Sequence, residues 1–129
     1  MQKNFLVLIC FFTSILGLVL IYIAAINIKP VEIEISQITS DLIGRSVSTQ
    51  GTIKQKKLNT DGHMFLVISD GKSDIQIPIF VSLMNDLKKN NITESDFKIN
   101  KPISVNGLVD EYKGQLEILP RKVSDINLK

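Results

Sequence analysis

Histidine and cysteine, two of the commonest proton carriers, nucleophiles and metal ligands, are scarce in this sequence. Its 129 residues include one histidine, His63, and one cysteine, Cys10. No Ser-His-Asp set for acyl transfer and no glycine-rich phosphate loop can be recognised. Metal chemistry would have to depend on carboxylates alone, and the acidic residues are explained as solvated turns. We therefore expect a binding protein and not an enzyme, with no metal and no other cofactor.

The charges divide the chain into two parts. The formal net charge is +2, and the first 30 residues contain only Lys3 and Lys29 as charged side chains. Residues 31–129 hold 13 basic and 13 acidic side chains, so this part is neutral. A neutral domain differs from strongly basic nucleic-acid-binding domains. A single cysteine excludes a disulfide scaffold and a cysteine-based zinc site.

The N-terminal part is apolar enough to cross a membrane. Residues 5–28 carry no charge, and a helix of this length covers about 36 Å against a hydrocarbon core of about 30 Å. Lys29-Pro30 should end the helix, because proline disfavours helical geometry in the preceding residue. We therefore predict a transmembrane anchor at residues 1–30, with residues 5–28 in the membrane, and a separate domain at residues 31–129.

A cleaved signal peptide is the alternative interpretation of this segment. The apolar region of a signal peptide has about 7–15 residues, and this run is much longer, which favours an uncleaved anchor. Lys3 and Lys29 flank the run on both sides, so the positive-inside rule does not separate the two orientations. A short basic tail before a long apolar run is typical of a signal anchor. We therefore expect a single-pass membrane protein with an extracytoplasmic domain.

The domain is predicted to consist mainly of strands. Alternating apolar residues predict strands or extended segments at residues 31–36, 46–57, 74–80, 102–112 and 115–119. The apolar run at 63–69 predicts a central strand, in which we expect Phe65 to face the core, as we do for Phe97. Residues 81–90 have apolar side chains at helical spacing. Gly51 and Gly107 lie in the middle of two strands, where a small barrel must curve sharply.

The order of these elements and three sequence segments resemble the OB-fold nucleic-acid-binding domains. The segments are GRSVSTQGTIKQ, MFLVISDGKSDIQIPIF and ISVNGLVDEYKGQLEILP, within residues 44–120. The resemblance implies a mainly β, five-stranded Greek-key barrel with one helix between the third and fourth strands. It is more specific for the fold than for the ligand.

The resemblance also implies where a ligand binds. OB-folds bind along the second and third strands, with the loops here at residues 56–62 and 110–114 closing over the ligand. Single-stranded nucleic acid needs cations for phosphates and aromatic rings for bases. The implied cations are Lys54, Lys56, Lys57, Lys72 and Lys113. The implied stacking side chains are His63, Phe80 and Tyr112. Acidic side chains surround the same region and repel phosphate: Asp61, Asp70, Asp74, Asp110 and Glu111.

Two other functions are compatible with parts of this pattern. The neutral charge and the few aromatic residues are equally compatible with a membrane-tethered module that binds proteins. The predicted architecture is also similar to that of the haem chaperone of cytochrome c maturation, which attaches haem through a histidine near its C-terminal end. The corresponding segment here, LPRKVSDINLK, has no histidine. We therefore expect no haem.

Overall fold

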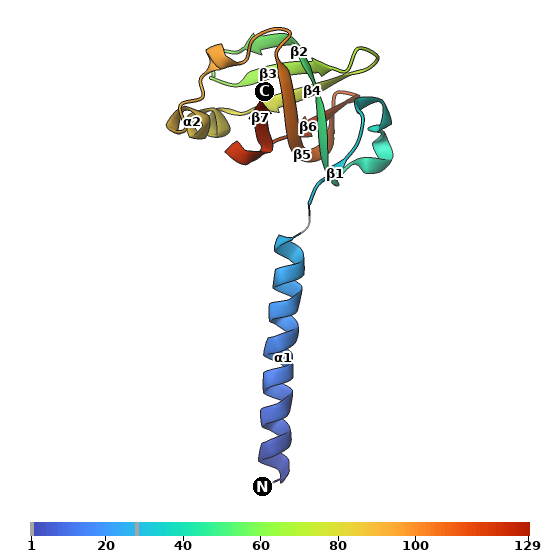
Figure 1. Ribbon diagram of the computed structural model, residues 1–129, viewed down its shortest axis with the longest axis vertical. Helices are drawn as coiled ribbons and strands as arrows, with labels where there is room; N and C mark the ends of the chain where they lie inside the picture. Colours follow the sequence, from blue (N-terminus) through green and yellow to red (C-terminus); the bar gives the residue numbers. More distant parts are fainter. Residues whose placement is uncertain (1, 28) are drawn as a thin grey trace.

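The computed structural model describes residues 2–27 and 29–129 and has two parts (Figure 1). A straight helix, α1 (Gln2–Ile26), projects from a β-barrel, and none of the described α1 residues is buried. The helix is long and apolar enough to cross a membrane, with a mean hydropathy of 2.8. The helix ends at Ile26, whereas the predicted membrane segment ends at residue 28. Residue 28 lies outside the described residues. The Asn27 side chain donates a 2.8 Å hydrogen bond to the Ile23 carbonyl at this end.

Seven strands form the sheet. They are β1 (Val31–Glu32), β2 (Ser46–Leu58), β3 (Met64–Ser69), β4 (Asp74–Ile79), β5 (Pro102–Tyr112), β6 (Gln115–Leu119) and β7 (Ile126–Leu128). Pairing runs β2–β3–β4–β6–β5 and returns from β5 to β2, so the sheet closes on itself. Closure leaves few exposed strand edges.

The number of strands differs from the five that the sequence predicted. The additional strands are short and pair with the long ones: β1 runs parallel to β2, and β7 runs antiparallel to β5. Each long strand changes its pairing partner along its length. Part of each long strand therefore has an edge to which a short strand can pair. The first half of β2 pairs with β5 and its second half with β3. The predicted strand at 31–36 is shorter in the structure, because the chain turns into the 3₁₀ helix that buries Ile35.

Two glycines lie where the long strands curve. A β-carbon at Gly107 would be 2.5 Å from the Leu119 carbonyl oxygen, and one at Gly51 would be 2.6 Å from that of Ser69. Such distances are too short for a side chain. The β5 backbone therefore passes β6 at a distance that only glycine allows.

Helices close the ends of the barrel. α2 (Val81–Lys89) follows β4 and buries Leu83, Met84 and Leu87. Four 3₁₀ helices complete the chain: η1 (Ile35–Gln37), η2 (Ser40–Leu42), η3 (Glu94–Asp96) and η4 (Val123–Asp125). Phe97, directly after η3, is fully buried, as predicted, among the inward-facing residues of the barrel.

Candidate nucleic-acid interface

Cross-strand neighbours from β2, β3 and β4 form two adjacent rows on the outer surface of the barrel. Lys57 of β2 lies opposite Phe65 of β3, which lies opposite Pro78 of β4. The next row joins Gln55, Val67 and Gln76. Directly opposed residues in a sheet point to the same side, and Met64, Leu66 and Ile68 occupy the core side. We call the surface of Gln55, Lys57, Phe65, Val67, Gln76 and Pro78 the β3–β4 face.

Phe65 is on this face and not in the core, so the prediction for this residue was wrong. Its side chain is 39% exposed and lines a groove of about 450 Å³ together with the rest of the face and Asn59. The apolar run at 63–69 concealed the alternation, because Val67 is also apolar but points outward. An exposed phenylalanine beside an exposed lysine offers a stacking surface and a cation for phosphate.

His63 and Phe80 extend the face at the end where α2 begins. Both follow the alternation of β3 and β4 that places exposed Phe65 and buried Pro78 on this face. Their rings meet edge to face at 5.4 Å between centroids, and Phe80 is 45% exposed. His63 also has a structural role, since its Nδ1 accepts a 2.9 Å hydrogen bond from the Val81 backbone N–H. This bond satisfies one of the free N–H groups at the start of the helix.

The three lysines of β2 point in different directions. Lys57 is exposed on the β3–β4 face, and the ion pairs among the described residues do not include it. Lys54 pairs with Asp74 at 2.8 Å, and this interaction holds the pKa of the Asp74 carboxyl below its usual value. Lys56 points to the other side of the strand and pairs with Glu94 at 2.7 Å. Only Lys57 is therefore placed to meet a ligand in the groove.

The opposite end of the face is acidic. Glu117 of β6 lies beside Gln76 and opposite Asp110 of β5, so the two carboxyl groups share one surface. Burial raises the pKa of the Glu117 carboxyl, and the nearby Asp110 raises it further. Glu117 could not be singled out from the sequence, because alternation alone does not show which strands become neighbours.

Tyr112 and Lys113 lie at the tip of the β5–β6 hairpin next to this acidic surface. Tyr112 is 59% exposed, and the Lys113 ammonium lies 5.4 Å from the centre of its ring. Positive φ angles at Lys113 and Gly114 form the tight turn. The structure therefore places these two predicted residues beyond the acidic pair, apart from Lys57 and Phe65.

Lys72 lies in the β3–β4 turn and lines a different depression, together with Glu32 and Glu34. The turn is held by Asp70, whose carboxylate accepts hydrogen bonds from the backbone of Ser73 and Lys72. These bonds lower the pKa of Asp70. Within residues 2–27 and 29–129, no three His, Cys, Asp or Glu side chains form a group that could hold a metal ion.

Solved structures with this fold are similar in shape but distant in sequence. The OBody AM1L10 bound to hen egg-white lysozyme has a TM-score of 0.61 at 20% identity, covering 80% of this chain and 98% of its own. Entamoeba histolytica asparaginyl-tRNA synthetase has a TM-score of 0.61 at 13% identity, covering 79% of this chain. A putative aspartyl-tRNA synthetase from Leishmania major has 0.57 at 12% identity, covering 78%. The chain matches only 24% and 21% of these two synthetases.

A comparison with curated protein sequences finds no match. The family model named tRNA anti-codon, described as an OB-fold nucleic acid binding domain, matches residues 47–126. The matched range begins in β2 and ends at the first residue of β7, so it includes the five strands β2–β6 that close the barrel. The chain therefore belongs to this family of OB-fold nucleic acid binding domains.

Proposed function

We propose that residues 1–30 anchor the chain in a membrane and that the barrel, residues 31–129, binds single-stranded nucleic acid on the β3–β4 face without catalysing a reaction. The observation that supports this most directly is the groove in which exposed Phe65 lies opposite exposed Lys57. His63 and Phe80 extend the stacking surface at one end. The extracytoplasmic location of the barrel stays a prediction.

The acidic residues restrict the proposed binding site to one end of the β3–β4 face. Lys57, Phe65, His63 and Phe80 lie toward the α2 end, whereas Asp110 and Glu117 lie toward the β5–β6 hairpin. Phosphates are attracted to the first end and repelled by the second. We therefore propose a short binding site centred on Phe65, with Tyr112 outside it.

Binding of a fluorescent oligothymidine of about 12 nucleotides to the full chain in detergent micelles tests this proposal by anisotropy. The logarithm of the binding constant should fall with the logarithm of salt concentration, with a slope of about −0.7 for each phosphate-bound lysine. Lys57→Gln should reduce the slope by about 0.7.

The matched control is Lys56→Gln, which removes the same charge from the other side of β2. It should leave the slope unchanged, because Lys56 is paired with Glu94. No detectable binding at low salt would contradict the proposal, as would equal effects of both variants.

Glu117→Gln should increase oligonucleotide affinity about two- to fivefold, since a unit charge several ångströms away contributes about 0.5–1 kcal/mol at a hydrated surface. Glu111→Gln is the matched control, because Glu111 alternates with Asp110 and lies on the other side of β5. Anisotropy titrations of both variants measure the difference. An unchanged affinity of Glu117→Gln would place the phosphates elsewhere.

The same variant should alter how stability depends on pH. The pKa of Glu117 is raised in the folded state, so its favourable contribution is complete below the ordinary value of 4.5 and is lost as pH rises through the folded value. Glu117→Gln should therefore unfold at higher denaturant concentration than the parent at neutral pH. The difference should shrink as the pH is lowered toward 4.5.

A protein partner is the second candidate, and one structural neighbour favours it. The OBody AM1L10, which shares this fold, is bound to a protein, lysozyme. The barrel residues are neutral, and Tyr112 offers an exposed aromatic side chain at a hairpin tip. A protein partner would remain bound after nuclease treatment and at high salt, whereas contacts to phosphate weaken steeply with salt.

A further inference from the structure

The connection between α1 and the barrel is too short to hold the barrel far from a membrane. The described helix ends at Ile26 and β1 begins at Val31, and four extended residues span at most about 14 Å. A helix of 25 residues is about 38 Å long, about 8 Å more than a hydrocarbon core of about 30 Å. With α1 across a membrane, the barrel surface next to the linker is therefore held within reach of the lipid headgroups.

The linker is also joined to the barrel in a defined way. Val31 and Glu32 pair in parallel with Val47 and Ser48, and the Ile33 N–H donates a 2.9 Å hydrogen bond to the Ser48 carbonyl. Pro30 lines a groove of about 430 Å³ together with Arg121 and Lys122. The β-pairing thus determines which surface of the barrel faces the membrane. We call the surface of Lys29, Arg45, Arg121 and Lys122 the anchor-side face.

The anchor-side face is positively charged. Its four residues are all exposed cations, and none takes part in an ion pair among the described residues. Arg45 directly precedes Ser46, which lines the same groove. The acidic residue of this groove, Asp125, accepts hydrogen bonds from the backbone N–H groups of Arg121 and Lys122, at 3.0 and 3.2 Å. Its carboxylate is therefore engaged with the backbone of the two residues that precede η4.

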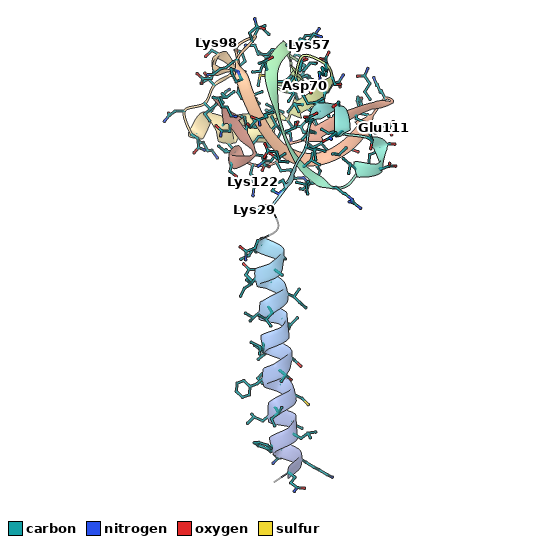
Figure 2. All side chains as sticks on the ribbon, turned by 45° about the vertical axis from the view of Figure 1, so that its right-hand side comes forward. Lys29, Lys57, Asp70, Lys98, Glu111 and Lys122 are labelled. Carbon is teal, nitrogen blue, oxygen red and sulfur yellow. The ribbon has the colours of Figure 1, made fainter. Side chains whose placement is uncertain are left out.

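Figure 2 shows how this charge is arranged relative to the helix. Lys29 and Lys122 lie together at the end of the barrel from which α1 projects, whereas Lys57 and Lys98 lie at the opposite end. An exposed apolar side chain, Val31 at 64% exposure, follows the linker directly. Cations beside an exposed apolar group fit the boundary between phospholipid headgroups and acyl chains.

We propose that the anchor-side face docks on anionic phospholipid headgroups of the membrane that holds α1, and so fixes the orientation of the barrel. This inference rests on the proposed membrane anchoring. Docking turns Lys57 away from the membrane and leaves the β3–β4 face accessible to a ligand. The barrel is then a surface-bound platform whose orientation depends on lipid charge.

Site-specific quenching in nanodiscs tests the proposal on the full chain. The parent for labelling contains Cys10→Ser and Ser124→Cys, because Ser124 is exposed in η4 between the groove residues Lys122 and Asp125. A fluorophore there is quenched by a spin-labelled headgroup lipid. Quenching should be at least about twofold stronger in phosphatidylserine-containing discs than in phosphatidylcholine discs, because the basic face is drawn to the anionic surface.

Two variants with the same change in charge separate docking from general attraction. Arg121→Gln with Lys122→Gln should abolish the difference between the two lipids. Lys88→Gln with Lys98→Gln removes two exposed cations elsewhere on the barrel and should preserve it. Excess glycerol phosphate should leave quenching unchanged, and a loss of quenching would overturn the proposal in favour of a soluble phosphate ligand.

Equal quenching in both lipids would also overturn docking, provided that the chain enters the discs. Failure of the chain to enter phosphatidylcholine discs would instead contradict the membrane anchoring on which docking depends. The two failures are therefore distinguishable in the same samples.

Discussion

Phe65→Ala is expected to weaken binding of a single-stranded oligonucleotide by a factor of roughly 5 to 150, since stacking of one base on an aromatic side chain contributes about 1–3 kcal/mol. Phe65 is 39% exposed on the β3–β4 face, so its removal takes away a contact surface and leaves the core intact. Circular dichroism of the full chain should be unchanged. Anisotropy titration at low salt measures the loss of affinity.

Three further variants make this prediction specific to stacking. Phe65→Tyr keeps the aromatic face and should bind like the parent, whereas Phe65→Leu keeps apolar area without a ring and should bind weakly. Ile99→Ala truncates an apolar side chain that is 52% exposed outside the β3–β4 face, and it should have no effect. Full affinity of Phe65→Ala, or equal binding by Phe65→Leu and Phe65→Tyr, would show that the ligand does not stack at this position.

The position of Phe65 shows where periodicity in the sequence stops being informative. Alternation places β5 at residues 102–112, as the structure has it, because its polar and apolar residues are clearly separated. In β3, Phe65 and Val67 point outward although both are apolar. A strand that presents an aromatic ring to a ligand on one side and apolar residues to the core on the other has the same apolar composition as a fully buried strand. Only the pairing of the strand with its neighbours shows which side faces the core and which faces outward.

The lysines of β2 illustrate a second limit. Simple alternation from Val47 places Lys54 and Lys56 on one side of the strand. The structure has a β-bulge between Ile53 and Gln55, which shifts the register against β3. A bulge adds one residue, so every later side chain changes sides. Lys57 consequently reaches the β3–β4 face and Lys56 turns toward Glu94, and neither placement could be predicted without the pairing partner.

The two mid-strand glycines were better predicted from the sequence than Phe65 or the lysines of β2. A glycine in a strand reflects a steric restriction at that position itself. Gly51 and Gly107 indicated curvature from the sequence, and the structure shows a neighbouring carbonyl oxygen at each position. In both cases that neighbour belongs to the strand that forms a hairpin with the strand of the glycine. Thr52 pairs with Ser69 and Leu108 pairs with Leu119, so each glycine lies next to the residue whose pairing partner carries the close carbonyl.

Gly107→Ala should therefore destabilise the barrel by about 3 kcal/mol, the upper end of the usual range for an overpacked core. The new β-carbon would be 2.5 Å from the Leu119 oxygen and 2.8 Å from the Ile118 Cγ2 atom. Ile118 could rotate, but the Leu119 carbonyl is part of the β5–β6 ladder and could move only if that pairing shifted. Such a loss is a large fraction of the roughly 5–15 kcal/mol that stabilises a typical domain.

Gly71→Ala is the matched control, because it separates backbone strain from steric overlap. Gly71 has a φ of 93° and open space around its α-carbon, so alanine there should cost only about 1 kcal/mol. Hydrogen exchange of the full chain in micelles reports the barrel separately from α1. Gly107→Ala should accelerate exchange of β5 and β6 amides far more than Gly71→Ala does. Equal protection in the two variants would mean that β5 and β6 are not held as closely as the closed sheet requires.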